Sequence, residues 1–164
     1  MEKVAFNLED YVSRVRTGPC FICELVRGNT HYAHHVVHAD DEHIAFLNKY
    51  PTLPGYCLVA PKVHLEDLSS DLDEASYVKL QTVVYRIARA LKAVFQAERI
   101  YVLSLGSKLG NSHLHWHVAP LPANVPYCEQ QFYALMAEHG VLNIDDEALA
   151  KMALQISAAM NTQS

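Results

Sequence analysis

The chain has 164 residues, of which 51% are apolar and 19% are charged, which is typical of one soluble globular domain and not of a disordered segment. Its formal net charge of -5 argues against sequence-independent binding to DNA or RNA, which needs a broad basic surface. We therefore expect no nucleic acid polymer as a partner. The first residues lack an apolar signal core and no run of eighteen apolar residues occurs, so we expect a cytoplasmic protein with no membrane partner.

The first predicted element is a short helix that begins after Asn7, a favourable N-cap residue, and ends at Gly18. It leads directly to Cys20 and Cys23. In a reducing compartment, cysteines at this spacing are more often a metal-binding or redox pair than a disulfide. A redox motif is disfavoured because no flanking strand and helix are predicted, whereas a reduced, empty pair that only packs stays open as an alternative.

The middle of the chain predicts three strands and the longest helix. The segments are strands over 35–38, 44–47 and 56–61 and a helix over about 71–96. The first two strands form a hairpin, and the third is mostly apolar and therefore buried. Ser69 or Ser70 is expected to cap the helix. Most of the histidines between His31 and His43 are irregularly spaced, so we expect them to be solvated.

The fourth and fifth strands are joined by a short loop over 107–112 and must be antiparallel neighbours. The fourth covers 99–106, and the fifth carries His113, His115 and His117 at alternate positions. Side chains two apart in a strand share a face. The three imidazoles therefore face one way, and Leu114, Trp116 and Val118 face the other.

Three adjacent imidazoles would repel each other once protonated, unless a metal, an anion or a hydrogen-bonded partner fixes their protonation. An exposed polar face of an edge strand is the alternative interpretation.

Beyond the histidine strand, which ends near Pro120, we predict a helical region over about 130–139. A final helix, capped by Asp145 or Asp146, runs to about Met160.

The loop from Gly106 to Ser112 has the composition of a phosphate-binding turn. Its glycines allow close approach of the backbone to a ligand, its serines and asparagine supply uncharged donors, and Lys108 supplies one positive charge. On its own such a loop is a weak signal, because glycine and serine are common in turns. Because this loop directly precedes three alternating histidines, we predict that the two together form a phosphate-binding pocket.

A second group of candidate ligands consists of Cys20, Cys23, His64 and one histidine of the triad. Two cysteines and two histidines complete a tetrahedron around zinc with no open position, which is characteristic of a structural site. The sequence therefore predicts structural zinc as the cofactor.

The segment His113-Leu-His115-Trp-His117-Val-Ala fits His-φ-His-φ-His-φ-φ, with φ apolar, so the chain resembles the histidine triad (HIT) superfamily. The segments 44–48, 54–55 and 58–64 look like its upstream block, and Cys20 to Cys23 looks like the zinc knuckle of its metal-bearing branches. The resemblance spans about 19–122, and we expect 1–164 to be a single domain in which 123–164 form a C-terminal helical extension. The implied fold is α+β: a five-stranded antiparallel sheet with a long helix between its third and fourth strands, usually in a homodimer.

The resemblance implies nucleotidyl transfer to histidine. His115 would attack an α-phosphate and form a nucleotidyl-histidine that water then breaks. His117 would hydrogen bond to phosphate oxygens. His113 would be the zinc ligand that joins Cys20, Cys23 and His64, or a hydrogen-bonding partner if no metal is present.

The resemblance also places four residues at the nucleotide. Asn48 falls where the family holds the ribose hydroxyls, Asn111 and Ser112 fall in the phosphate loop, and Ser104 falls where a polar residue commonly reaches the nucleotide. Two features depart from the family pattern: the loop is shorter before His113, and Tyr56 replaces a histidine. In the divergent C-terminal part, Tyr127, Glu129 and Gln130 are candidates to face the pocket.

Taken together, these features favour a nucleotide hydrolase that cleaves a dinucleoside polyphosphate or a nucleoside phosphoramidate. A phosphorylase or nucleotidyltransferase differs only in the acceptor that replaces water. A nucleotide-binding module with little turnover would keep the pocket without the chemistry. A further alternative makes the triad an open catalytic metal site.

Overall fold

The computed structural model describes residues 2–162, and they form two antiparallel sheets. The larger sheet has five strands in the order β2-β3-β4-β6-β5, and the smaller one pairs β1 with β7. The strands are β1 (Lys3–Val4), β2 (Val36–Ala39), β3 (His43–Leu47), β4 (Cys57–Pro61), β5 (Arg99–Ser104), β6 (Trp116–Leu121) and β7 (Val141–Leu142). The predicted five-stranded antiparallel sheet is confirmed. The small sheet was missed because strands of two residues carry no periodic signal.

The predicted helical segments occur in the predicted order and differ at their ends, whereas the helical segments Phe21–Val26 and Thr30–Tyr32 were not predicted. They are α1 (Leu8–Thr17), α2 (Phe21–Val26), η1 (Thr30–Tyr32), α3 (Glu74–Phe95), η2 (Tyr127–Glu129), α4 (Phe132–Leu135), η3 (Ala137–His139) and α5 (Asp146–Asn161). Asn7 caps α1 and Asp145 caps α5, as predicted. The helical region predicted over 130–139 is broken into short turns, because Gln131 has a positive φ and Met136 is extended.

The predicted cap of α3 at Ser69 or Ser70 is wrong. Asp73 caps this helix by accepting a hydrogen bond from the backbone N–H of Ser76 at 2.7 Å. The backbone N–H groups of Ser69 and Ser70 instead donate to the carboxylate of Asp67. That carboxylate stabilises a separate turn before the helix, which therefore begins later than predicted.

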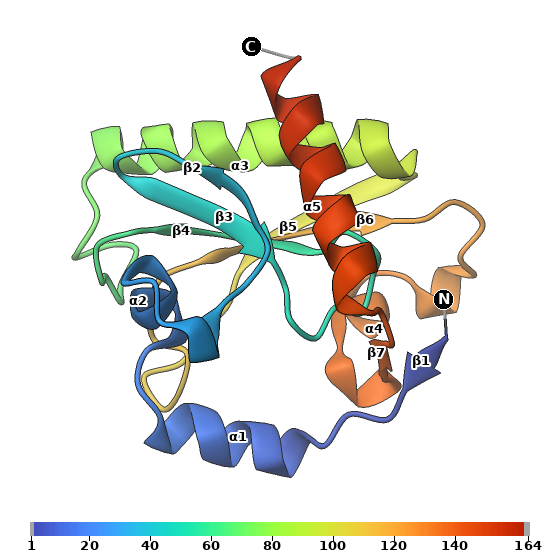
Figure 1. The fold of residues 1–164 in the computed structure, drawn as a ribbon, viewed down its shortest axis with the longest axis horizontal. Coiled ribbons are helices and arrows are strands. Elements are labelled where there is room, and N and C mark those ends of the chain that lie inside the picture. Colours follow the sequence, from blue (N-terminus) through green and yellow to red (C-terminus); the bar gives the residue numbers. More distant parts are fainter. Residues whose placement is uncertain (1, 163–164) are drawn as a thin grey trace.

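The large sheet is packed on both faces. Figure 1 shows α3 lying along the sheet, with α5 crossing it and α1 at the opposite side of the molecule. Alternate residues of β3 divide between two cores: Ala45 and Leu47 pack with α3 and α5, whereas Ile44 and Phe46 pack with Ile22 of α2. Burial of both faces explains why β3 is apolar throughout. None of the described helices is long and apolar enough to cross a membrane.

The histidine strand begins later than predicted: β6 starts only at Trp116. The backbone N–H of Leu114 donates to the carbonyl of Leu65 at 2.7 Å instead of joining a strand ladder. The neighbouring strand β4 ends at Pro61, which has no N–H to donate. The hydroxyl of Ser104 donates to the carbonyl of His115 at 2.8 Å and satisfies the first backbone group outside the ladder.

Gly55 lies at the turn before β4 and has a φ of +74°. A Cβ at this position would come within 2.2 Å of the Phe95 ring at the end of α3. Gly28 offers a matched comparison, since its φ is +80° and a Cβ there would meet no heavy atom within 4 Å.

We expect Gly55→Ala to lower the free energy of unfolding by about 1–3 kcal/mol more than Gly28→Ala does, because only the first change adds overpacking to the cost of a positive φ. Urea denaturation of both variants measures this difference. Equal losses in the two variants would show that the Phe95 ring moves aside without cost.

Candidate active site and metal centre

The three histidines of the triad lie on one side of the chain, as the alternation predicts. Leu114, Trp116 and Val118 pack into the core beneath α3. The rings of His115 and His117 have their centroids 4.8 Å apart. The alternative of an exposed edge face is wrong, because β6 is an inner strand and His113 and His115 are only 1% and 4% exposed.

The position of the His115 ring is fixed by its own backbone neighbourhood. Its Nδ1 lies 2.6 Å from the carbonyl oxygen of His113, an acceptor that requires the proton to be on Nδ1. The lone pair of the neutral ring is therefore on Nε2. A Cβ on Gly106 would lie 3.9 Å from Cε1 of this ring, so the loop that follows β5 passes close to the carbon between its two nitrogens.

His117 makes a side-chain contact that its sequence pattern does not predict. Its Nδ1 lies 3.0 Å from the hydroxyl of Tyr56, which comes from the turn before β4. The substitution of Tyr56 for a histidine was the one signal in the sequence for this contact. A phenol can donate or accept; when Tyr56 donates to Nδ1, the ring proton of His117 is on Nε2.

Burial keeps the triad uncharged. It is the main cause that lowers the pKa of His113 to about 4 and the pKa of His115 below its ordinary value. Burial, followed by repulsion from His115, lowers the pKa of His117 to about 3. The repulsion expected between adjacent imidazolium ions is thus avoided, because the rings are neutral at pH 7.

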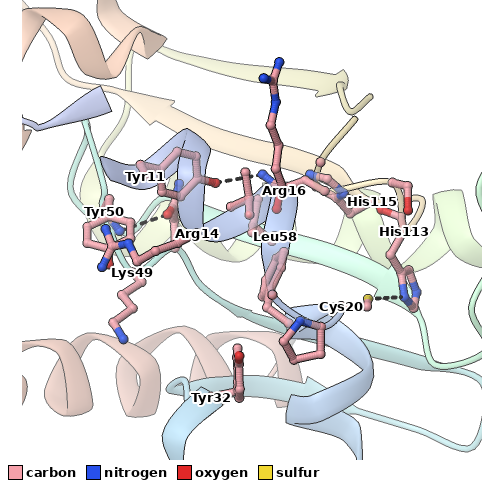
Figure 2. Close-up of a pocket in the computed structure, with 18 of the residues that line it drawn as sticks. Tyr11, Arg14, Arg16, Cys20, Tyr32, Lys49, Tyr50, Leu58, His113 and His115 are labelled. Carbon is pink, nitrogen blue, oxygen red and sulfur yellow. Dashed lines mark hydrogen bonds between the residues drawn. The ribbon is translucent and has the colours of Figure 1, made fainter. Parts of the chain in front are cut away.

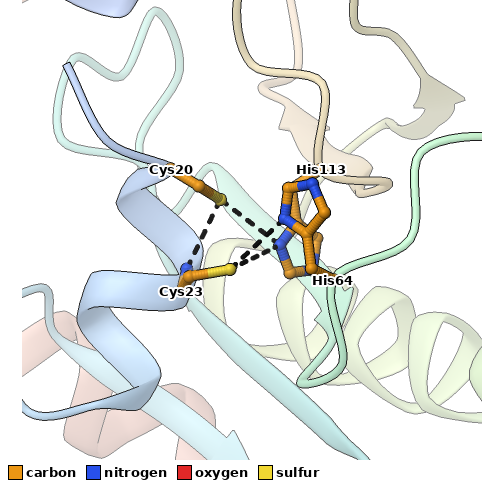
Figure 3. A group of neighbouring side chains, drawn as sticks. All are labelled: Cys20, Cys23, His64 and His113. Atoms are coloured by element: carbon orange, nitrogen blue, oxygen red, sulfur yellow. Dashed lines mark hydrogen bonds between the residues drawn. The ribbon is translucent and has the colours of Figure 1, made fainter.

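The predicted metal ligands converge on one point. Figure 3 shows Cys20 and Cys23, at the start of α2, facing His64 and His113. The ligand atoms of these four residues all lie within 4.8 Å of one another. Within residues 2–162 this is the only such group of three or more histidine, cysteine or acidic side chains. His115 and His117 are outside it, which argues against the triad as an open metal site.

The four donors fit tetrahedral zinc. Zinc bonds of about 2.3 Å to sulfur and about 2.0–2.1 Å to nitrogen separate a sulfur from a nitrogen ligand by roughly 3.5 Å. The Sγ of Cys20 lies 3.4 Å from Nδ1 of His113, and the Sγ of Cys23 lies 3.3 Å from Nδ1 of His64.

The other nitrogen of each histidine is held as a metal ligand requires. The Nε2 of His113 donates to the carbonyl of Pro61 at 2.8 Å, and the Nε2 of His64 donates to Glu66 at 3.1 Å. Each ring therefore presents a deprotonated Nδ1 to the sulfurs. Burial and the neighbouring Cys20 raise the pKa of the Cys23 thiol, and a bound cation would offset this by favouring the thiolate.

A pocket of about 690 Å³ opens beside the triad. All three triad histidines line it, and Figure 2 shows Tyr11 and Tyr50 at one end and Cys20 with His113 at the other. Its described lining includes no aspartate or glutamate, although the chain has a net charge of -5. It does include four cationic residues, Arg14, Arg16, Lys49 and Lys108. The composition of this pocket favours an anionic ligand.

A family model described as the HIT domain matches residues 29–123. The chain belongs to the HIT family. The match covers the triad, His64 and the five-stranded sheet, whereas α1 and the two candidate cysteine ligands precede it.

Individual proteins and structures are also similar to this chain. An uncharacterized HIT-like protein of Saccharolobus solfataricus is 32% identical over 116 residues, which are 69% of this chain and 81% of that protein. A Zn-bound histidine triad family protein from Mycobacterium smegmatis superimposes with a TM-score of 0.70 at 22% identity, over 88% of this chain and 94% of that one. An AP-4-A phosphorylase of Mycobacterium tuberculosis is 35% identical over 80 residues, 46% of this chain and 40% of that protein.

Three of the four residues that the HIT resemblance places at the nucleotide line the pocket. They are Asn48, Asn111 and Ser112. The Oδ1 of Asn48 accepts from the backbone N–H of Tyr50 at 3.0 Å, which fixes its side chain. The fourth residue, Ser104, lies outside the pocket lining and contacts the backbone of His115 instead.

The N-terminal helix forms a wall of the pocket that the HIT motifs do not indicate. Tyr11 of α1 accepts a hydrogen bond from the side-chain amide of Asn111 at 2.8 Å, and Val15 would lie 3.0 Å from a Cβ on Gly110. The residues expected to face the pocket from the C-terminal part, Tyr127, Glu129 and Gln130, are not among its described lining. The basic residues of α1 were the only sequence signal for its role.

Proposed function

We propose that this HIT protein cleaves the bond between the α-phosphate of a nucleotide and its leaving group through a nucleotidyl intermediate on His115. The Nε2 lone pair attacks phosphorus, the bond from phosphorus to the leaving oxygen breaks, and the leaving group departs with the electron pair. Water then attacks phosphorus, the bond to Nε2 breaks, and a proton is released. Dividing one displacement into two suits a weak nucleophile such as water.

The observation that carries this proposal is the hydrogen bond from Nδ1 of His115 to the carbonyl of His113. It leaves Nε2 unprotonated, in a ring that lines a pocket without carboxylates among its described residues. As phosphorus bonds to Nε2, the ring becomes positive, and the same carbonyl stabilises that charge through the Nδ1 proton. We assign His117, oriented by Tyr56, to donate its Nε2 proton to a phosphate oxygen.

The cations that line the pocket favour a dinucleoside polyphosphate over a phosphoramidate. Arg14, Arg16, Lys49 and Lys108 provide more positive charge than one phosphate needs, whereas a leaving group with several phosphates would use it. We propose that Asn48 binds the ribose and that the segment of Asn111 and Ser112 lies against the phosphates. Ser104 contributes by holding the backbone of His115.

Cys20, Cys23, His64 and His113 would hold the structural zinc. When bound, it would stabilise the fold and fix the ring of His113, whose carbonyl positions His115.

Phosphorolysis is the second candidate, favoured by the similarity to the AP-4-A phosphorylase. Its first step is the same, and inorganic phosphate replaces water as the acceptor. A binding module with little turnover would keep the pocket but would transfer the nucleotide neither to water nor to phosphate.

Product analysis separates these functions. Diadenosine tetraphosphate is incubated with the protein, with and without inorganic phosphate, and the nucleotides are separated by chromatography. Hydrolysis predicts AMP and ATP in both reactions. ADP and ATP formed only when phosphate is added would replace hydrolysis with phosphorolysis, and no products in either reaction would contradict both.

We also propose that residues 1–164 form one domain that assembles as a homodimer. β5 is an edge strand of the large sheet, and Val102 on it is 46% exposed, so it offers unpaired backbone groups and an apolar side chain to a second copy. Light scattering that gives the mass of one chain would contradict the dimer.

A further inference from the structure

Glu66 connects the metal ligands to the pocket. It lies in the segment between β4 and α3, and one of its oxygens, Oε1, contacts two residues from different parts of the chain. Oε1 accepts from Nε2 of His64 at 3.1 Å and from the hydroxyl of Ser112 at 2.7 Å. The backbone N–H of Glu66 donates to the carboxylate of Asp71 at 2.9 Å, which fixes this segment.

On the metal side, Glu66 determines which nitrogen of His64 carries the proton. Because Nε2 donates to the carboxylate, Nδ1 is left deprotonated 3.3 Å from the Sγ of Cys23. A carboxylate in this position orients a ligating histidine and raises its basicity. His113 is held instead by a backbone carbonyl, so Glu66 is the side chain that orients a metal ligand here.

On the pocket side, Glu66 anchors the end of the loop over 106–112. Ser112 lines the pocket and directly precedes His113, whose carbonyl orients His115. Asn111, the residue before it, donates from its side-chain amide to the hydroxyl of Tyr11 at 2.8 Å, so contacts on both sides hold this end of the loop. A shift of Ser112 would therefore move the backbone at the phosphate side of the pocket.

We propose that Glu66 is a positioning residue that couples the zinc centre to the phosphate loop, by holding the metal ligand His64 and the loop residue Ser112 with the same oxygen. Metal binding fixes His64 and through it Glu66 and Ser112. Ser112 in turn affects metal affinity, although it offers no ligand to the cluster. The effect on nucleotide affinity rests on the proposed function of the pocket.

A double-mutant cycle on zinc affinity tests the coupling. Zinc is titrated against a chromophoric chelator for the unchanged chain, Glu66→Ala, Ser112→Ala and the double variant, and the absorption spectrum of the Co²⁺ form checks that the ligand set is intact. Outer-shell changes typically weaken metal binding about 10–100-fold, so we expect at least about 10-fold for Glu66→Ala. We expect a several-fold loss for Ser112→Ala in the unchanged chain and none in the Glu66→Ala background.

Two further variants control this cycle. Glu66→Gln keeps an oxygen acceptor and is expected to retain part of the coupling. Glu42→Ala removes a carboxylate that pairs with Lys79 on the surface and is expected to leave zinc affinity unchanged. An unaltered zinc affinity in Ser112→Ala, or the same loss in both backgrounds, would overturn the coupling.

AMP binding tests the transmission to the pocket. We expect zinc to tighten AMP binding, AMP to tighten zinc binding by the same factor, and this factor to fall to about one in Glu66→Ala. Equal AMP affinity with and without zinc, or no AMP binding, would overturn the transmission. If AMP binding and the cycle behave as expected but no substrate is cleaved, the proposed function fails and the coupling stands.

Discussion

His115→Asn is expected to lower the cleavage of diadenosine tetraphosphate by at least about 10³-fold, because removal of a nucleophile eliminates the covalent route and leaves only the binding of the substrate. The asparagine side chain can still donate to the carbonyl of His113, so the backbone of the triad should keep its position. Steady-state rates of AMP release, at substrate concentrations that saturate each form, measure the change.

Two controls test whether the loss of activity comes from the missing nucleophile. The affinity for AMP should change only a few-fold, because the cations and Asn48 that line the pocket are untouched. His38→Asn alters a histidine of the β2–β3 hairpin that contacts Asp40, and it should leave turnover unchanged. A His115→Asn protein that turns over at a tenth of the original rate or faster would rule out His115 as the nucleophile.

Cys23→Ser is expected to lower the melting temperature by about 10 °C, because the loss of a structural zinc site costs several kcal/mol and about 1 kcal/mol shifts the midpoint by about 2–4 °C in a chain of this size. Chelation of the unchanged protein should cause a shift of similar size. Calorimetry of the variant and of the unchanged protein, both in the presence of zinc, measures the shift.

Cys128→Ser is the matched control, because Cys128 is an exposed free cysteine outside the metal cluster. It should keep both the bound metal and the melting temperature. If Cys23→Ser melted with the unchanged protein, the cysteines would be an empty pair that only packs. If chelation stopped turnover without any loss of stability, the metal would belong to the chemistry.

The sheet and the cluster of metal ligands could be predicted because their residues carry strong local signals. Alternation of His115 and His117 with Trp116 and Val118 predicts a strand with one apolar face, and the structure has that face, although the strand begins at Trp116. Two cysteines spaced like Cys20 and Cys23, together with two histidines, are a common ligand set for structural zinc. Which histidine of the triad joins them followed from the family resemblance, since local pattern alone carries no information on distant contacts.

Other features depend on contacts that no local pattern encodes. The start of β6 is determined by Pro61 and by Leu65, which lie in distant segments. The helix α1 could be predicted from its cap and spacing, but its packing on Gly110 and Asn111 could not. The cap of α3 was missed for a local reason: Asp67 holds Ser69 and Ser70 in a separate turn, and Asp73 caps the helix.

The proposed reaction requires a covalent bond between Nε2 of His115 and the phosphorus of a nucleotide. It is tested most directly by mixing the protein with diadenosine tetraphosphate for a short time, quenching in alkali, which preserves a phosphorus–nitrogen bond, and mapping the modified peptide by mass spectrometry. We predict one AMP group per chain, attached to His115 and removed by mild acid. An AMP group on another residue, or AMP product with no modified protein at any quench time, would contradict the account.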